Sequence, residues 1–234
     1  MGVERVMNNL DNHQLVNQTS GNTEWYSPIE LVEAARRVMG EIDYDPASSY
    51  RANHNIVRAN RFCAAPEYEI VGEIGGLPVR HYQGGGLALL AWYGRIWMNH
   101  PFGNTERACS PKCTKKTCQK RGWHTHEDIA GNTEWVRRIV NDYLAGYTVE
   151  ACVLTFAATS EAWFTPLKQC PMCLIDGRIN YLDPVTLKPV KGVTKGSVVT
   201  YLGENRHGFV REYSQFGPVM IPAAMTKYYQ GVTP

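Results

Sequence analysis

The sequence has no run of about 18 apolar residues, the length that a membrane-spanning helix needs. It begins with MGVERVMNNLDNHQLVNQ, which lacks the apolar core of a secretory signal peptide. There is little excess charge, since 24 Lys and Arg residues oppose 22 Asp and Glu residues for a net charge of +2. We therefore expect a cytoplasmic protein without a membrane partner. Any nucleic-acid surface must come from local clusters of basic residues.

Motifs for disulfides and for nucleophilic hydrolysis are missing as well. In a reducing compartment, seven cysteines suit metal binding better than disulfide bonds. The seven histidines are not accompanied by a Gly-x-Ser-x-Gly element or a comparable nucleophile motif. With 44% hydrophobic and 20% charged residues, 234 residues are enough for one α/β domain with a small insertion.

The apolar pattern predicts alternating helices and strands between residues 23 and 234, after a flexible N-terminal arm at residues 1–22. Ser27, Pro28 and Glu30 fit a capping box that starts a helix ending at Gly40. Residues 64–86 are predicted as a loop because of their glycines, and 55–62 fit a helix or a strand. The other predicted elements are strands at 41–46, within 87–98, at 149–157, at 177–182 and at 197–203, and a helix from Asn132 or Thr133 to Leu144.

Two polar residues are predicted at the carboxyl ends of strands. Asp45 ends the first strand, and Asn99 follows the run that closes with Ile96 to Met98. In an open, mostly parallel sheet, ligands bind outside these ends, so both residues should face one crevice. Asp43 stands two residues before Asp45 on this strand, and we expect one of the two carboxylates to point toward the crevice. Arg95 and Arg178, each within a Gly-Arg-Ile triplet, are predicted to be structural.

The segment Asn99-His100-Pro101-Phe102 has the groups needed to hold a planar base that carries an exocyclic amine. The Asn99 side-chain oxygen and the His100 carbonyl can accept the two N–H bonds of the amine. Pro101 fixes the turn, and Phe102 offers a ring for a flipped base to stack on. A methyl donor in line with the amine would then complete a transfer reaction, largely through orientation. The alternative is a polar turn that closes a buried strand.

A series of short motifs resembles the phage-type DNA N6-adenine methyltransferases, the phage Dam family. In chain order they are WYSP, LVEAARRVMG, IDYDPAS, AN, WYGRIWMN-x-PF-G, a buried strand ending in Thr, WF and C-x-GRI-x-Y. The resemblance covers roughly residues 24–217. It implies a Rossmann-like methyltransferase fold with a Cys-rich insertion, S-adenosylmethionine as donor, DNA as substrate, and a phage or prophage gene acting in a bacterial cytoplasm.

The resemblance also assigns residues to the site. It implies that Tyr26, Ser27 and Pro28 line the methionine end of the donor, and that Asp45, Pro46 and Ala47 lie beneath it. Residues 99–102 match the catalytic (D/N/S)-P-P-(Y/F) element.

The chain departs from the family pattern at two points. His100 replaces the usual proline, and the donor motif lacks Gly-x-Gly. The acid that binds the donor ribose is left open among Glu67, Glu69 and Glu73. Methylation of cytosine N4 and an inactive DNA-binding protein of the same fold are the alternative functions.

The insertion at 104–131 carries closely spaced soft ligands. Three thiols and an imidazole suit a tetrahedral structural zinc ion, and the predicted ligands are Cys109, Cys113, Cys118 and His124. His126 is the substitute ligand, and Cys170 and Cys173 could join the site or be unrelated. The alternative is a set of buried or free thiols. Cys63 and Cys152 are predicted to be core residues.

The same insertion is basic, with no acidic residue between positions 107 and 121. Such a run is often a solvated loop, but a position beside the Asn99 element favours contacts with DNA phosphates. The predicted DNA-binding residues are Arg107, Lys112, Lys115, Lys116, Lys120 and Arg121.

Overall fold

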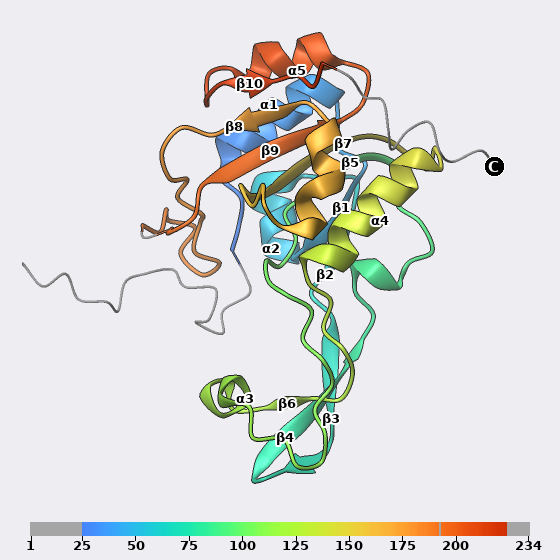
Figure 1. Cartoon of the computed structure of the whole chain (residues 1–234), viewed down its shortest axis with the longest axis vertical. Coiled ribbons are helices and arrows are strands. Elements are labelled where there is room, and N and C mark those ends of the chain that lie inside the picture. Colours follow the sequence, from blue (N-terminus) through green and yellow to red (C-terminus); the bar gives the residue numbers. More distant parts are fainter. Residues whose placement is uncertain (1–24, 192, 224–234) are drawn as a thin grey trace, which may run out of the picture.

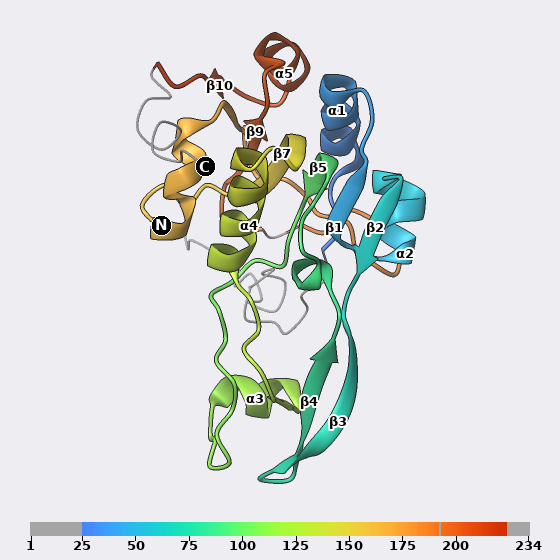
Figure 2. The same ribbon diagram turned by 90° about the vertical axis from the view of Figure 1, so that its right-hand side faces the viewer.

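The structure, a computed structural model, describes residues 25–191 and 193–223. A seven-stranded sheet with helices on both faces forms the main body, and a smaller lobe projects from one end of it (Figure 1, Figure 2). The arm predicted for residues 1–22 lies outside the described residues. None of the helices in the described ranges combines the length and apolar composition that a membrane span requires.

The main sheet joins a parallel half to an antiparallel half. Its strand order is β10-β8-β9-β7-β5-β1-β2, with parallel pairing from β2 to β7 and antiparallel pairing from β7 to β10. The strands are β1 (Tyr44–Ser48), β2 (Arg61–Ala64), β5 (Gly94–Met98), β7 (Thr148–Phe156), β8 (Met172–Leu174), β9 (Ser197–Leu202) and β10 (Val219–Met220). The α/β class with a mostly parallel sheet is confirmed and is compatible with a Rossmann-like fold.

Helices cover both faces of this sheet. The side of α1 and α5 buries Leu31, Val38 and Phe209, and the side of α4 buries Trp135 and Ile139. The helices are α1 (Ile29–Met39), α2 (Tyr50–Ala52) with a π-helical turn (Asn53–Val57), α4 (Asn132–Leu144), a 3₁₀ helix (Ala162–Gln169) and α5 (Arg206–Tyr213). The helix predicted to end at Leu144 is therefore confirmed, and 50–57 is helical, with β2 after it.

The alternation of side chains along β5 decides which face each residue meets. Trp97 belongs to the apolar layer under α1, whereas Ile96 and Met98 belong to the layer under α4. The same two-residue period continues into the turn after the strand. Asn99 therefore lies on the α1 side of the sheet, and His100 lies on the α4 side.

The start of α1 differs from the prediction. The helix begins at Ile29, and Pro28 precedes it without a side-chain capping bond. Ser27 is buried, and its hydroxyl accepts a hydrogen bond from Trp97 Nε1 at 3.3 Å. The predicted capping box is wrong because Ser27 faces the core.

The projecting lobe contains the Cys-rich insertion together with a hairpin that we predicted as a loop. Strands β3 (Glu67–Ile74) and β4 (Leu77–Gln83) are antiparallel, and β4 pairs in parallel with β6 (His124–Thr125) of the insertion. Gly75 and Gly76, read in the sequence as loop residues, have φ of 56° and 81° and form the hairpin turn. The lobe also contains α3 (Lys116–Arg121).

The strand predicted within 87–98 is confirmed at Gly94–Met98. A 3₁₀ turn at Gly86–Ala88 precedes it, and Leu90 is 99% exposed. The Trp92 side chain donates from Nε1 to the Gly86 carbonyl at 2.9 Å, which holds this segment as a compact turn. Of the strand predicted at 177–182, only Leu182 pairs, in a bridge with Tyr26.

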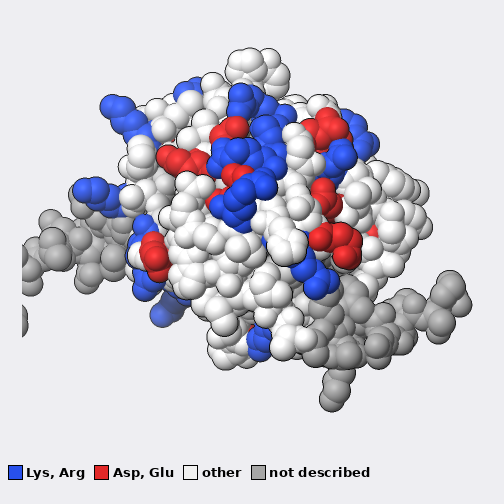
Figure 3. All heavy atoms as spheres, turned by 90° about the horizontal axis from the view of Figure 1, so that it is seen from above, with Lys and Arg blue, Asp and Glu red and all other residues white. Residues whose placement is uncertain are grey.

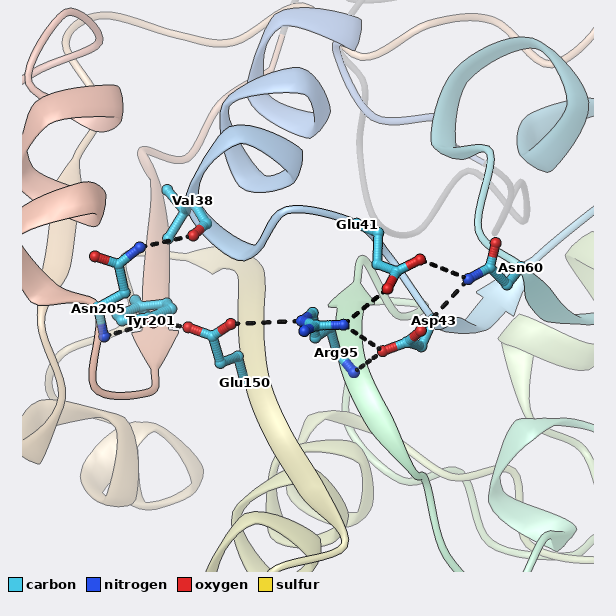
Figure 4. A network of polar contacts seen from close by, with 8 residues as sticks. All are labelled: Val38, Glu41, Asp43, Asn60, Arg95, Glu150, Tyr201 and Asn205. Carbon is cyan, nitrogen blue, oxygen red and sulfur yellow. Dashed lines mark hydrogen bonds and ion pairs between the residues drawn. The ribbon is translucent and has the colours of Figure 1, made fainter.

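A polar network joins the strands at the end of the sheet opposite the lobe (Figure 4). Arg95 of β5 lies between Glu41 (2.9 Å), Asp43 (3.5 Å) and Glu150 of β7 (3.8 Å). Glu150 also accepts a hydrogen bond from the Tyr201 hydroxyl of β9. The single guanidinium therefore connects three carboxylates, which supports the structural role predicted for Arg95.

Replacing Arg95 with Met keeps the side-chain volume and removes the charge that these carboxylates share. We expect the free energy of unfolding to fall by about 1–3 kcal/mol, because three acids would then face one another without a cation. Arg211→Met is the matched control. Arg211 is exposed, and among the described residues its ion pair is with Glu212 alone, so the substitution should cost less than about 1 kcal/mol. Equal losses in urea unfolding would contradict the central role of Arg95.

Candidate active site and metal centre

A cleft opens beside the ends of β1 and β5. The cleft and the solvent directly over it together make up about 240 Å³ of atom-free space. It brings together five of the predicted site residues: Tyr26, Ser27, Asp45, Ala47 and Asn99. Trp25 and the α2 region complete the wall with Ala52, Ile56 and Val57. Pro28 and Pro46, predicted beside the donor, are not among the lining residues.

Asn99 is held in one orientation by the backbone. Its Nδ2 donates to the Trp25 carbonyl at 3.0 Å. Only the amide nitrogen can donate to a carbonyl, so this contact distinguishes Nδ2 from Oδ1 in the Asn99 side chain. None of the described residues donates a hydrogen bond to Oδ1, which leaves this oxygen as an acceptor at the cleft.

His100 turns away from the cleft. Its side chain is 2% exposed, its ring stacks on Trp135 at 5.9 Å, and Nε2 lies 2.9 Å from Asn132 Oδ1. The backbone N–H of Gly103 approaches the same oxygen at 3.4 Å, so Nε2 carries the proton. Burial lowers the pKa of His100 to about 4, against the hydrogen bond with Asn132, so the ring is neutral. The imidazole braces the turn against α4, and only the backbone of His100 remains for a role in the cleft.

Phe102 is half-buried in an aromatic cluster. Its ring lies 4.4 Å from the Phe156 ring and 6.1 Å from the Tyr181 ring, and the edge of His100 is 5.3 Å away. Pro101, beside it, is exposed. The cluster fixes the position of the turn after Asn99. No spacing rule linked Phe156 and Tyr181 to this turn, because they come from distant parts of the chain.

Asp45 is the one carboxylate that lines the cleft. It is 2% exposed, and its Oδ1 accepts from the Ala47 amide at 3.1 Å. Burial raises the pKa of Asp45 to about 7, although hydrogen bonds from Ala47 and Ser48 oppose this rise. Asp43 instead accepts from the Arg95 amide at 2.8 Å, so Asp45 is the residue of the pair that faces the cleft.

The acids considered for ribose binding lie elsewhere. Glu67, Glu69 and Glu73 belong to β3 in the lobe, and none of them lines the cleft.

The four predicted metal ligands meet in the lobe. The ligand atoms of Cys109, Cys113, Cys118 and His124 all lie within 4.8 Å of one another and could hold a metal ion. Gly122 ends α3 with φ of 81° and lets the chain return to His124. Both ring nitrogens of His124 are buried without a hydrogen-bond partner among the described residues. Burying such groups is costly unless another atom, such as a metal, binds them.

The remaining candidates do not join this cluster. His126 is exposed, and its ring packs edge-on against His81 at 5.5 Å. Cys173 belongs to β8 of the main sheet, where its thiol contacts the Tyr213 carbonyl at 3.4 Å, and Cys170 is buried with the core residues under α4. Cys152 is buried as predicted, whereas Cys63 is only half-buried.

The basic residues of the insertion differ in their surroundings. Arg121 donates twice to Glu106, at 2.6 and 2.9 Å, and lies 3.6 Å from the centre of the Trp123 ring, so it stabilises the lobe. Arg107 pairs with Asp128, and Lys115 donates to the Arg107 carbonyl at 2.7 Å. Lys112, Lys116 and Lys120 are exposed. Neighbouring acids therefore neutralise part of the positive charge that the sequence suggested.

A second group of basic residues lies on the face opposite the lobe, where Lys and Arg side chains gather beside Asp and Glu (Figure 3). Arg37 and Arg211 of this end both pair with Glu212. Arg36 pairs with Glu33. This face is therefore a mixed surface of ion pairs.

The buried carboxylate should make stability depend on pH. Because the folded pKa of Asp45 is above its unfolded value, the folded chain keeps a proton that the unfolded chain has lost. The free energy of unfolding should therefore decrease as pH rises, by about 2–3 kcal/mol between about pH 5 and pH 8. In Asp45→Asn this decrease of the free energy of unfolding with pH should disappear. Urea unfolding curves with the same pH dependence in both proteins would show that Asp45 does not titrate in this range.

We predict that the cluster of Cys109, Cys113, Cys118 and His124 binds a metal ion. We expect purified protein to contain about one metal ion per chain, measured by inductively coupled plasma mass spectrometry, because three thiols and an imidazole converge. Cys118→Ser should lose the ion, and Cys63→Ser, outside the cluster, should keep it. Equal metal content in the two variants, or none in the parent protein, would rule out this centre.

Comparison with known proteins leaves the function to be inferred from these residues. Neither the protein-family models nor the curated proteins compared with this chain match it. The resemblance in the motifs and the geometry of the cleft are therefore the basis for the assignment of function.

Proposed function

We propose that this protein is a DNA methyltransferase that transfers a methyl group from S-adenosylmethionine to the N6 amine of adenine. The observation that carries the proposal is the position of Asn99. The Trp25 carbonyl holds its amide nitrogen, so the side-chain oxygen is presented as an acceptor at the edge of a cleft. An exocyclic amine needs such an acceptor.

The cleft has features that suit one end of the proposed donor. Trp25 and Tyr26 offer aromatic surface, and the buried Asp45 has no cation paired with it among the described residues. The donor carries positive charge on its sulfonium and ammonium groups, so it would favour the charged form of Asp45. The motif resemblance assigns Tyr26 and its neighbours to the methionine end of the donor, so the cleft that they line would hold that end.

The residues of the turn would prepare the amine for attack. Asn99 Oδ1 and the His100 carbonyl accept hydrogen bonds from the two N–H groups of the amine. These contacts favour a tetrahedral nitrogen, whose lone pair is then available to attack the methyl group. When bound, S-adenosylmethionine supplies the methyl group: the new N–C bond forms as the C–S bond breaks, leaving S-adenosylhomocysteine. The amine then releases one proton to water. Pro101 and the buried His100 side chain restrict the turn, so the contribution of the protein is mainly orientation and electrostatics.

The lobe would contribute to DNA binding. It projects from the sheet at the end where β2 leads into β3 and β5 leads through the Asn99 turn into the insertion (Figure 1, Figure 2). Lys112 and Lys116 are exposed there without an acidic partner among the described residues. We assign the metal as zinc, because three thiolates and one imidazole are its usual structural ligands. Its role would be to hold the insertion together.

The proposal is tested by incubating the protein with DNA and S-adenosylmethionine carrying a labelled methyl group, followed by nucleoside mass spectrometry. We expect N6-methyladenine, and a decrease of about 100-fold or more in rate for Asn99→Ala, by analogy with the loss of one electrostatic contact in other active sites. His100→Pro is the control, since proline also provides the carbonyl, and should stay within about tenfold of the parent.

Each other result has a distinct meaning. Detection of N4-methylcytosine would support the proposed mechanism but identify cytosine, not adenine, as the base that is methylated. Activity that is unaffected by Asn99→Ala would remove the assigned role of this residue. Donor and DNA binding without any methylated product would indicate an inactive DNA-binding protein of the same fold.

A further inference from the structure

The loop between β8 and β9 brings two basic residues to the aromatic cluster of the proposed active site. The loop spans 175–196 and extends from the sheet on the same side as the lobe (Figure 1). Its last residues are fixed to the end of β7, because the Ala157 amide donates to the Gly196 carbonyl at 2.9 Å. Ser197 then pairs with Phe156 in the sheet. The residues around Gly196 are therefore held beside Phe156.

Arg178 lies against Gly196 and has no structural partner in the described ranges. A Cβ atom added at Gly196 would lie 3.3 Å from Arg178 Nη1, so the guanidinium crosses this glycine. Arg178 is exposed, and no described residue forms an ion pair or hydrogen bond with its side chain. Arg95 and Arg121, by contrast, each bind carboxylates. The structural role that we predicted for Arg178 is therefore not supported by any such contact.

Lys195 adds a second cation, close to the ring of Phe156. Its Nζ lies 5.5 Å from the centre of the Phe156 ring, and that ring packs at 4.4 Å on Phe102. The Lys195 side chain is exposed. Lys195 thus places one positive charge beside the base-stacking element, and Arg178 lies against the next residue, Gly196.

We propose that Arg178 and Lys195 bind the DNA backbone phosphates that flank the flipped nucleotide, an inference that rests on the proposed function. A nucleotide that leaves the helix keeps its two phosphates near the mouth of the pocket, where they need cationic partners. A guanidinium can bind a phosphate through two parallel hydrogen bonds, and an ammonium binds it as a compact charge. Both contacts are to the backbone, so they are independent of base sequence. The loop 175–196 and the lobe would then hold DNA on two sides of Asn99.

The test compares Arg178→Ala, Lys195→Ala and the double variant with Lys188→Ala, which removes an exposed lysine from the same loop. Binding of a fluorescein-labelled DNA duplex of mixed sequence is measured by anisotropy between roughly 50 and 200 mM salt. We expect each site variant to reduce the slope of log Kd against log salt by about 0.9, and the double variant by about 1.8, since each removes one phosphate contact. Lys188→Ala should keep the parent slope.

The outcomes separate this inference from the function on which it rests. Equal slopes in the parent and the double variant, with methyl transfer intact, would overturn the phosphate contacts and leave the methyltransferase in place. A parent protein that neither binds DNA nor transfers methyl would overturn both. A reduced slope with near-parent turnover at saturating DNA would support the proposal, because the two side chains would then act in binding and not in the chemical step.

Discussion

The hydrogen bond from Asn99 Nδ2 to the Trp25 carbonyl is the contact on which the candidate site depends. It fixes the amide at the end of β5, and the alternation of side chains then sends His100 to the opposite face of the sheet. There the imidazole is buried against Trp135 and Asn132. One residue of the turn is thus available to a ligand, and the next anchors the turn in the core. In the proposed methyltransferase, packing of His100 against α4 would supply the rigidity that a proline ring gives in the motif that this turn resembles.

The lobe is stabilised by other interactions than the main body. It has few buried apolar residues, and β3 is exposed over almost its whole length. Its stability comes instead from the Cys/His cluster, from the Arg121–Glu106 pair and from Arg80, which lies between the rings of Tyr68 and Trp123 at 3.8 and 4.7 Å. A small unit of this kind gains much from a bound metal, since its core alone buries little surface. The fold therefore places a cleft at the edge of the main sheet and a lobe with a candidate metal centre on the same chain.

The sequence predicted those features that depend on local spacing. The helix 132–144, the β7 strand and the convergence of Cys109, Cys113, Cys118 and His124 follow from periodicity and ligand spacing. Features that depend on contacts between distant segments were missed. The hairpin at 67–83 was hidden by its glycines, and Ser27 was read as a helix cap although it packs in the core. Asn132 was predicted only as a possible first residue of a helix. Its hydrogen bond to His100 is seen only in the structure, because no spacing rule links residues so far apart.

The most direct test of the donor site is calorimetric titration with S-adenosylmethionine near pH 7 in buffers of different ionisation enthalpy. Because Asp45 is partly protonated there, a cationic ligand should lower its pKa and release a fraction of a proton on binding. We predict saturable binding with proton release in the parent protein, and binding without that release in Asp45→Asn. Absence of binding to the parent protein would contradict the assignment of this cleft as a methyl-donor site.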